Sequence, residues 1–412
     1  MATPKLRFDG FSGNWVTTQL GNVCSFTQGV QIPQSEQINE ERDGYIRYLY
    51  IRDFFSDKFK CYVPNIYPEK IIHPHEIMMV NTGNTTGEAY TGRYGVLSNN
   101  SFKISYDLAH FNDQFMYLFC SSELAQNQIK KFFNAGGQPH LGHKNISQIL
   151  ISYPKKQEQT KIASFLSAVD EKISQLNQKH ELLSQYKQGM MQKLFSQQIR
   201  FKADDGSEFG EWKKVKFSDK FKFHQTNSYS RALLSEQGEI MNIHYGDIHT
   251  KFSTLFDISK EVVPFLSSEV NTNKFAEDQF LQVGDLVIAD ASEDYKDIGK
   301  ALEIIHLNNQ KVVAGLHTYI ARPVQPFALG FCGYLMQTFE VREQIKKLAT
   351  GISVLGISKT NIGKVEIKVP CLEEQTKIAN FLSAIDQKIE VVAQQIEQAK
   401  QWKKGLLQQM FV

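Results

Sequence analysis

The sequence EQTKIASFLSAVD at residues 158–170 returns as EQTKIANFLSAID at residues 374–386, so a stretch of thirteen residues occurs twice with two differences. Chance identity is roughly one in twenty at each position, which makes this match a duplication. The same offset of 216 residues relates further segments, among them Gln128–Lys131 with Gln344–Lys347 and Pro154 with Pro370. The chain therefore alternates a variable segment, a repeated segment, a second variable segment and a second repeated segment.

Each repeated segment carries apolar residues at alternating steps of four and three, which is the heptad pattern of a coiled-coil helix. The proline before each segment can end a strand without breaking the helix that follows. At 1.5 Å per residue, about 38 residues predict a rod of roughly 55–60 Å. The predicted seam residues are Ile162, Leu166, Val169, Ile173, Leu176 and Leu183 in the first helix and Ile378, Leu382, Ile385, Ile389, Val392 and Ile396 in the second.

A single rod of this length cannot bury its seam alone, so each helix needs a partner. The other repeated helix is the obvious partner. Antiparallel pairing would relate the two halves by a pseudo-twofold axis and place the two variable domains at opposite ends. Parallel pairing, or pairing with a helix of another protein, are the alternatives.

The two variable segments share a coarse pattern that predicts a β-rich α/β domain used twice. We expect domains over residues 1–153 and 200–369, with the repeated helices within 154–199 and 370–412. Each domain begins with a Trp-containing strand, Trp15–Gln28 or Trp212–Gln225. Further strands are expected at Tyr45–Ile51, Glu76–Val80 and Phe102–Ser105, and at Ile240–His244, Asp285–Ala289 and His317–Ala321. One helix then follows in each domain, over about Asn112–Phe133 and Phe327–Ala349. The fold class is α+β or mixed, with two such domains in tandem separated by two long antiparallel coiled-coil helices.

Length and composition place the chain among multidomain globular proteins. At 412 residues it is long enough for two or three cores. No run of eighteen apolar residues occurs and the first eight residues lack the apolar core of a secretory signal, so a cytoplasmic location is expected. Five scattered cysteines without a CxxC pair predict reduced thiols. The net charge of +2 means that a nucleic-acid partner would require basic residues concentrated on one surface.

Polar and glycine-rich stretches separate the predicted strands. The stretch at residues 81–87 reads NTGNTTG, and DASE stands at 290–293 in the second half. Asn, Gln, Ser, Thr and Arg are the residues that contact base edges, whereas Lys and backbone amides hold phosphates. Ordinary turns are the alternative interpretation. Divergent loops on nearly constant helices suit two domains with different targets on one frame.

The sequence offers no convincing catalytic or metal site. The histidine pairs His73/His75, His140/His143 and His244/His249 lack a known ligand set, and none recurs in the other half. The second half has the acidic residues Asp285, Asp290 and Glu293 where the first half has Glu76, Asn81 and Asn84. This difference argues against a catalytic dyad shared by both halves. Gly136-Gly137 lacks the Lys-Ser/Thr of a phosphate loop.

This order resembles the specificity subunit of type I restriction–modification enzymes. The resemblance rests on the Arg-Phe…Gly…Trp opening of each half, at Arg7–Trp15 and Arg200–Trp212. It rests also on the Asn-Ile…Pro segments that start at Asn145 and Asn361, and most strongly on the two Glu-Gln-x-Lys-Ile-Ala-x-Phe-Leu-Ser-Ala starts. The match extends over essentially the whole chain.

The resemblance implies that two target-recognition domains each read one half of a bipartite, asymmetric site in double-stranded DNA. The helices would set the unread spacer and dock two modification subunits, which bring S-adenosylmethionine and adenine methylation. Restriction subunits would add translocation and cleavage with ATP and Mg. This chain would be non-catalytic, without a cofactor of its own, because it lacks the methyltransferase tetrapeptide, the Walker motif and a nuclease motif. A coiled-coil scaffold with two protein-binding heads is the main alternative, and a self-contained nuclease or methyltransferase is the other.

Individual DNA contacts do not follow from the resemblance, because the reading loops of the family diverge. Residue type and position in the loops predict the candidates. They are Arg52, Asn81, Thr82, Asn84, Thr85, Arg93, Asn99, Gln138, His140 and Lys144 in the first half, and His249, Asp290, Ser292, Lys296, Lys300, Ser353, Ser358 and Lys359 in the second.

Overall fold

The computed structural model describes residues 3–133 and 139–412. It divides into two compact units, Met1–Gln178 with Ala393–Val412 and Lys179–Val392. The repeated segments form the long helices α4 (Lys156–Phe195) and α9 (Leu372–Met410), and each helix contributes to both units. The predicted long helices are therefore confirmed, with 40 and 39 residues.

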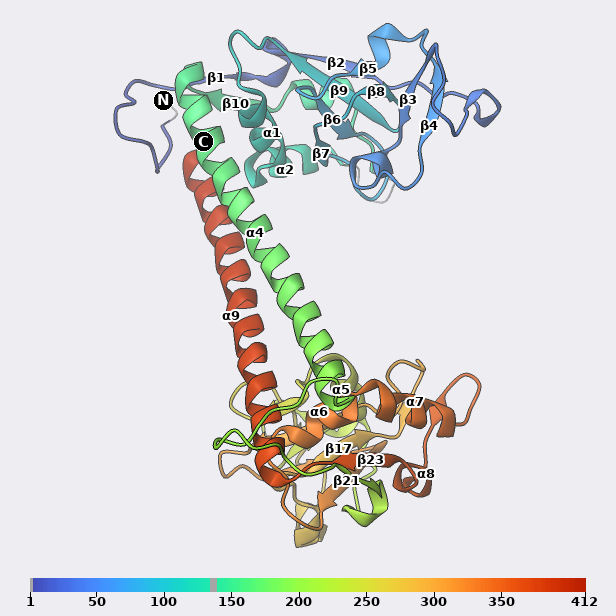
Figure 1. Ribbon diagram of the computed structural model, residues 1–412. Helices are drawn as coiled ribbons and strands as arrows, with labels where there is room; N and C mark the ends of the chain where they lie inside the picture. Colours follow the sequence, from blue (N-terminus) through green and yellow to red (C-terminus); the bar gives the residue numbers. More distant parts are fainter. Residues whose placement is uncertain (1–2, 134–138) are drawn as a thin grey trace. The chain divides into compact units, whose positions relative to one another are not determined.

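Within the described residues, the first unit contains three small sheets and three short α-helices, several of which are labelled in Figure 1. Strand β1 (Val16–Gln19) pairs with β10 (Leu150–Tyr153). The second sheet has the order β2 (Cys24–Gln28), β9 (Ser101–Tyr106), β6 (Ile77–Val80), β7 (Ala89–Tyr90), and the third β4 (Cys61–Pro64), β3 (Tyr45–Leu49), β8 (Gly95–Leu97), β5 (Ile71–Ile72). The helices are α1 (Asp113–Ser121), α2 (Glu123–Lys130) and α3 (His143–Ser147).

The second unit repeats this plan with more strands. Strand β11 (Lys213–Lys216) pairs with β23 (Glu366–Val369). A five-stranded sheet has the order β12 (Phe221–His224), β21 (Thr318–Pro323), β17 (Leu286–Ala289), β19 (Ala301–His306), β15 (Leu255–Asp257). Smaller sheets contain β13 (Leu234–Ser235), β16 (Phe265–Leu266), β14 (Met241–Ile243) and β20 (Val312–Ala314), and β18 (Ala291–Ser292) with β22 (Leu355–Gly356). The helices are α5 (Tyr245–Thr250), α6 (Phe331–Gln337), α7 (Phe339–Leu348) and α8 (Lys359–Gly363).

Two expected elements are each divided in the structure. The helices predicted over Asn112–Phe133 and Phe327–Ala349 are the pairs α1/α2 and α6/α7, which are interrupted at Ser122 and Thr338. Both residues are extended, and their hydroxyls donate to the carbonyl oxygens of Phe119 and Leu335 at 2.7 and 2.8 Å. This local hydrogen bond competes with the helix, which explains the break.

The Trp-containing strands are divided as well. In the first unit the 3-10 helix η1 (Leu20–Asn22) separates β1 from β2, and in the second unit η5 (Phe217–Asp219) separates β11 from β12. The first residue of each turn is fully buried and donates its backbone N–H, Leu20 to Ile149 and Phe217 to Val365, at 2.8 Å in both cases. Burial of this residue turns the chain from one sheet into the next.

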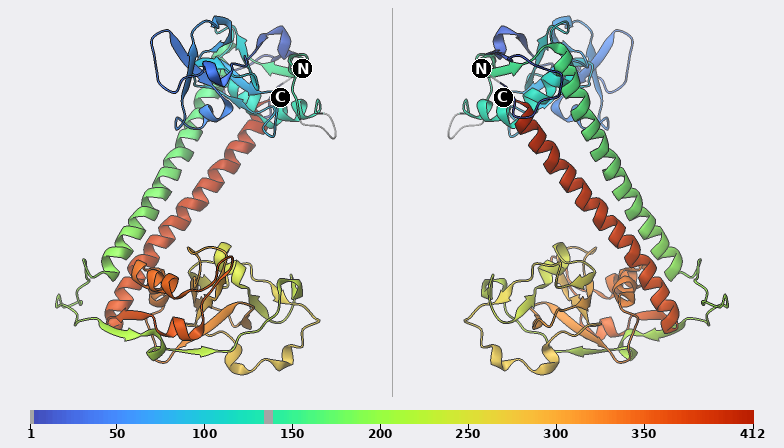
Figure 2. Two further views of the ribbon diagram at one scale, coloured as in Figure 1. Left: turned by 90° about the vertical axis from the view of Figure 1, so that its right-hand side faces the viewer. Right: turned by 90° about the vertical axis from the view of Figure 1, so that its left-hand side faces the viewer.

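Within each unit, one end of α4 lies antiparallel to the opposite end of α9 (Figures 1 and 2). In the first unit, Asp170 of α4 binds Lys403 of α9 at 2.6 Å, and the rings of Phe165 and Trp402 are 5.9 Å apart. In the second unit, Lys187 of α4 binds Asp386 of α9, also at 2.6 Å. The 216-residue offset relates Asp170 to Asp386 and Lys187 to Lys403, so each ion pair is the repeat equivalent of the other. The helices therefore pair in the same way in both units. The pseudo-twofold axis itself stays a prediction.

The predicted seam residues are buried, apart from three that are half-buried. The half-buried ones are Ile173, Leu183 and Ile389. The start of each seam also belongs to the core of its own unit: Ile162 and Leu166 pack in one cluster with Phe115, and Ile378 and Leu382 in another with Phe331. Each long helix is thus anchored in a globular core before it continues as a rod.

The duplicated glutamate at the start of each helix is buried and holds the opening of its half. Arg7 donates two hydrogen bonds to Glu158, from Nε at 2.7 Å and from Nη2 at 2.8 Å. Trp15 Nε1 donates to the same carboxylate at 3.4 Å. A two-pronged guanidinium–carboxylate pair is among the strongest hydrogen-bonded arrangements in proteins.

The second unit repeats this arrangement, except that the tryptophan donates to the other carboxylate oxygen. Arg200 donates to Glu374 from Nε at 3.0 Å and from Nη2 at 2.8 Å, and Trp212 Nε1 donates at 3.0 Å. In each half, the arginine and tryptophan of the opening motif are therefore partners of the buried glutamate that begins the Glu-Gln motif.

The glutamine that follows each glutamate holds the segment that leads from the proline into the long helix. Gln159 donates to the carbonyl oxygen of Pro154 at 2.9 Å and accepts from the backbone N–H of Asn112 at 2.9 Å. Gln375 donates to Pro370 at 2.9 Å and accepts from Ala328 at 3.0 Å. A buried amide bound at both ends positions the helix start against the segment before α1 or α6.

We predict that Arg7→Met destabilises the first unit by about 2–3 kcal/mol, because it leaves the carboxylate of Glu158 buried without its cation. The expected loss is below that for a fully buried pair, since Arg7 is 17% exposed. Chemical denaturation measures the loss, and amide hydrogen exchange places it at the start of α4. The exposed Arg42→Met is the control. A change within about 0.5 kcal/mol at Arg7 would contradict the structural role.

We also predict that Asp170→Lys and Lys403→Asp each weaken the helix pair in the first unit, while the double exchange restores it. Each single change places like charges opposite one another, at a cost of about 0.5–1 kcal/mol because both side chains are partly exposed. A double-mutant cycle on the free energy of unfolding measures the coupling. Additive effects would show that the two residues do not pair in solution.

Candidate nucleic-acid interface

The polar loop after β6 packs against the segment before α3 and forms one surface of the first unit. The backbone N–H of Leu141 donates to the carbonyl oxygen of Asn81 at 2.8 Å, and Thr82 Oγ1 lies 3.0 Å from His140 Nδ1. We call the side chains of Thr82, Asn84, Thr85, His140 and Lys144 the loop face. Asn84, His140 and Lys144 are exposed, and Thr82 and Thr85 are half-buried.

Three other candidates of the first half lie differently. Asn81 is only 4% exposed, and its side chain lies inward beneath the loop. Arg93 is half-buried and bound to Asp57 at 3.1 Å. Gln138, with the glycine pair before it, lies outside the described residues. Asn81 and Arg93 are therefore placed to support the surface, and Arg52 and Asn99 belong to the groove described below.

The second unit joins the equivalent loops in the same way. The backbone N–H of Ile357 donates to the carbonyl oxygen of Asp290 at 2.9 Å. Many candidates here are held by their own unit: Asp290 binds His317 at 3.1 Å, and Ser292 is buried against the backbone of Asp294. Lys296, Ser353 and Ser358 are exposed, although Ser358 caps α8, and Lys359 lies 5.1 Å from the ring of Tyr319.

A basic cleft of about 500 Å³ gathers three second-half candidates. His249, Lys296 and Lys300 line it together with Lys187 and Arg342, while Asp297 is its one lining carboxylate among the described residues. Lys300 donates from Nζ to the carbonyl oxygen of His249 at 2.7 Å. Burial lowers the pKa of Arg342. The cleft concentrates positive charge on the second unit.

The first unit also contains a polar groove of about 1100 Å³. We call it the amide groove. Its walls come from the segments 31–39, 48–52 and 58–61 and from the turn at Asn99. The polar lining residues are Gln31, Gln34, Gln37, Asn39, Tyr48, Tyr50, Arg52, Lys58, Lys60 and Asn99.

Only Arg52 and Asn99 of this groove were among the candidates drawn from sequence. The others lie on separate segments that the fold brings together, and sequence reasoning centred on glycine-rich loops passed over them. One signal was present: Gln28, Gln31, Gln34 and Gln37 follow one another at intervals of three residues, with Asn39 after them. The pattern marks the segment as rich in side-chain amides, and part of it forms the 3-10 helix η2 (Gln34–Glu36) in the structure.

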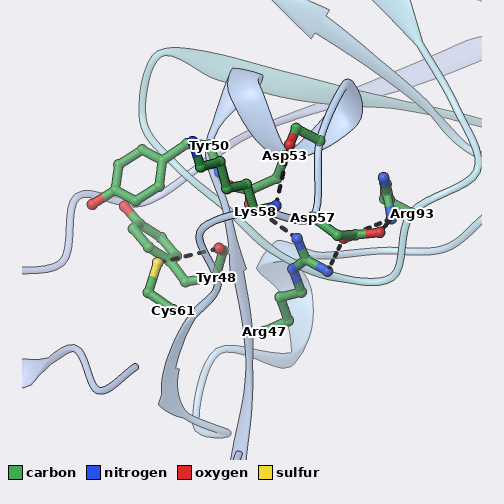
Figure 3. A network of polar contacts seen from close by, with 9 residues as sticks. Arg47, Tyr48, Tyr50, Asp53, Asp57, Lys58, Cys61 and Arg93 are labelled. Atoms are coloured by element: carbon green, nitrogen blue, oxygen red, sulfur yellow. Dashed lines mark hydrogen bonds and ion pairs between the residues drawn. The ribbon is translucent and has the colours of Figure 1, made fainter. Parts of the chain in front are cut away.

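A network of ion pairs fixes one wall of the groove (Figure 3). Arg47 of β3 lies between Asp53 and Asp57, at 3.0 and 2.6 Å, and Arg93 binds Asp57 from the other side. Asp53 is fully buried and also accepts from the backbone N–H of Tyr50 at 2.8 Å. Hydrogen bonds from Arg47 and Arg93 lower the pKa of Asp57. The turn η3 (Ile51–Phe54), which carries Arg52, is thereby held in place.

Two tyrosines form the floor of the groove. Burial raises the pKa of Tyr48 to about 12, so its hydroxyl keeps its proton and donates to the carbonyl oxygen of Val30 at 2.7 Å. The hydroxyl of Tyr50 donates to Gln37 Oε1 at 2.9 Å, and Gln37 Nε2 donates to the carbonyl oxygen of Ile32 at 2.8 Å. These bonds hold the segment 31–39 against the strand.

The carboxylates that aligned in the two sequences have structural partners. Glu76, just before β6, lies 3.6 Å from Lys103 of the neighbouring strand β9. Asp285, just before β17, binds Arg322 of the neighbouring strand β21 at 2.7 Å. Across residues 3–133 and 139–412, no group of three or more His, Cys, Asp or Glu is placed to hold a metal ion. Nor does a helix in these ranges have the length and apolar character to cross a membrane.

Comparison with known proteins identifies the family. The family model described as type I restriction modification DNA specificity domain matches the chain twice, at residues 12–185 and 210–401. The type I restriction enzyme MjaVIII specificity subunit of Methanocaldococcus jannaschii is 28% identical over 409 residues, which is 96% of this chain and 91% of that protein.

Solved structures show the same fold. The S subunit of a type I restriction-modification system from M. genitalium aligns with a TM-score of 0.57 at 14% identity, over 100% of this chain and 99% of that chain. A chain from a structure on complex assembly and conformational transition of the type I R-M system aligns with a TM-score of 0.58 at 15% identity, over 96% and 97%. The chain therefore belongs to the type I restriction modification DNA specificity family, and it is a non-catalytic specificity subunit of a type I restriction–modification system.

Proposed function

We propose that the two variable domains, residues 1–153 and 200–369, each read one half of a bipartite, asymmetric site in double-stranded DNA. One observation carries the proposal. The same buried Arg–Glu–Trp cluster anchors both units, while the exposed surfaces differ: an amide groove and loop face in the first unit and a basic cleft in the second. A constant anchor with different polar surfaces suits two different targets on one frame.

Two tethered reading units gain affinity because the second binding event becomes intramolecular. Phosphate contacts would position each unit, from Lys296 and Lys300 in the second unit and from Lys144 in the first. Side chains of the loops would then specify bases, at roughly 1–3 kcal/mol for each good bidentate pair. The remaining sequence candidates, from Thr82 and Asn84 to Ser353 and Ser358, stay proposals of this kind.

The helices, within residues 154–199 and 370–412, would set the unread spacer and dock two modification subunits. Those subunits would bring S-adenosylmethionine for adenine methylation, and restriction subunits would bring ATP and Mg. This chain would carry no cofactor and work in the bacterial cytoplasm. The salt dependence of DNA affinity distinguishes this proposal from a scaffold with two protein-binding heads. DNA affinity that depends on phosphate contacts falls steeply as salt concentration rises, whereas a protein-binding scaffold would show no such DNA affinity.

The exchange of residues 1–153 for the same domain of a relative is predicted to change one half-site and leave the other intact. The physical reason is that each unit has its own core and its own polar surface. Methylome sequencing of cells that express the variant with its modification partner reads both half-sites. The reciprocal exchange of residues 200–369 is the matched control, and it should change the other half. A change of both half-sites by either exchange would refute independent reading.

We predict that a heptad inserted into both α4 and α9 lengthens the spacer by about three base pairs, since seven residues add roughly 10.5 Å and a base pair rises about 3.4 Å. Seven residues keep the seam in register, which preserves the pairing of the helices. Methylome sequencing measures the spacer, and an equal insertion in the exposed loop at Asp205 is the control. A folded variant with the original spacer would show that the helices are not the ruler.

A further inference from the structure

The amide groove has no assigned role, and its lining points to a ligand. We propose that it is the surface by which the first unit reads base edges in the major groove of duplex DNA, with its amides on the bases and Arg52, Lys58 and Lys60 on the phosphates. This inference rests on the proposed function and deepens it.

The amides suit base edges because a side-chain amide offers a donor and an acceptor side by side. Asn or Gln can bind adenine in this way at N6 and N7. Gln34 and Asn39 are exposed, and no side-chain hydrogen bond is recorded for either within the described residues. They are therefore free to take a ligand.

Two further amides face the groove in a fixed orientation. Asn99 Nδ2 donates to Gln31 Oε1 at 3.3 Å, which leaves the amide nitrogen Nε2 of Gln31 and the side-chain oxygen Oδ1 of Asn99 available. Gln37 has a different task, because Tyr50 and the carbonyl oxygen of Ile32 already occupy its oxygen and its nitrogen. The reading set is thus Gln31, Gln34, Asn39 and Asn99, with Gln37 as its support.

The charges around the groove favour an anionic ligand. No carboxylate lines it in the part of the chain that the structure describes. Its three cations are exposed and have no ion pair among the described residues: Arg52 lies 4.7 Å from the ring of Tyr50 and Lys58 lies 5.4 Å from that of Phe59. The neighbouring Arg47 and Arg93, in contrast, are neutralised by Asp53 and Asp57. Unpaired cations beside amides form the combination that holds phosphates while bases are read.

The lining also argues against a small-molecule site. Such pockets are mostly apolar and enclose their ligand, whereas this groove is broad and lined mainly by amides and cations. The Arg47–Asp53–Asp57 network holds the turn that carries Arg52, so the backbone of this wall needs little rearrangement on binding, and the cost of ordering falls on the exposed amide and cationic side chains (Figure 3). A polar groove with a preorganised backbone suits the edge of a duplex.

The loop face is the competing surface on the same unit, and the two are contiguous. Asn81, beneath the loop face, donates its backbone N–H to the carbonyl oxygen of Asn100, one residue from Asn99 in the groove. DNA seated in the groove could therefore reach the loop face at its margin. The experiment has to separate bases read in the groove from bases read by the loop.

The test uses the full chain in complex with its modification subunits. Three double variants are compared: Gln34→Ala with Asn39→Ala in the groove, Lys58→Ala with Lys60→Ala in the groove, and Asn84→Ala with Lys144→Ala on the loop face. All six side chains are exposed, so the fold should persist, and thermal melting checks this. Lys130→Ala with Lys131→Ala removes the same charge from the same unit outside the groove and is the matched control. The probes are a duplex with the wild-type methylated motif and a shuffled duplex.

The inference expects two signatures. The Gln34/Asn39 variant should lose roughly 5- to 150-fold in affinity for the motif duplex for each of the two amides that contacts a base. It should keep its affinity for the shuffled duplex, and in methylome sequencing it should lose base specificity only in the half-site of the first unit. The Lys58/Lys60 variant should weaken both duplexes alike and reduce the slope of log affinity against log salt by about two.

Three results would overturn it. In the first, the half-site of the first unit loses its base specificity in the loop-face variant and keeps it in both groove variants. In the second, neither groove variant changes DNA affinity. The Lys58/Lys60 variant could also lose modification subunits while its DNA affinity stays unchanged, which would make the groove a protein interface. Failure of the proposed function is distinguishable, because the wild-type complex would then methylate no bipartite motif.

Discussion

The fold depends on a carboxylate that is buried at the start of each long helix. Glu158 and Glu374 are 3% and 1% exposed, and each accepts hydrogen bonds from an arginine and a tryptophan more than 140 residues earlier in the chain. A buried carboxylate without a cation is expensive, so each half has one arrangement in which this charge is satisfied. That arrangement brings the opening of the half, the first strand and the helix together. The neighbouring glutamine then sets the direction in which the helix leaves the core.

The constancy of this anchor leaves the rest of each unit free to vary. The central sheets keep their strand order through β2–β9–β6–β7 and β12–β21–β17–β19, and the pairing of β1 with β10 returns in β11 with β23 at the same register. Between these shared strands, the loops differ in length, charge and partners. Ser292 donates to the carbonyl oxygen of Asp294, and Asp290 binds His317, whereas Asn84 is exposed at a similar place in the first unit. One scaffold thus presents two unlike surfaces.

Sequence reasoning succeeded where the physical signal was periodic or duplicated. The long helices, the seam and the strands within the named ranges followed from heptads, alternation and the repeat, whereas short strands such as β5, β7 and β13 did not. It failed at Ser122 and Thr338, because a single hydroxyl that bonds the preceding turn changes an element without a change in hydropathy. It also missed most of the amide groove, because Gln34, Lys58 and Asn99 meet through strand pairing between distant segments. The partners of Asn81 and Asp290 were equally hidden, since burial of a loop residue depends on what packs upon it.

The first unit is built from two segments far apart in the sequence, and this affects the order in which the units fold during synthesis. Its core contains Phe411, which stacks on Phe115 at 5.1 Å, and the backbone N–H of Leu6 donates to the carbonyl oxygen of Gln409. Residues near the amino terminus therefore lack their final packing partners until more than 200 further residues have emerged from the ribosome. At about 5–20 residues per second, this interval lasts on the order of ten to fifty seconds. Meanwhile the second unit can begin to form its own core, so the amino-terminal unit is the later of the two to be completed.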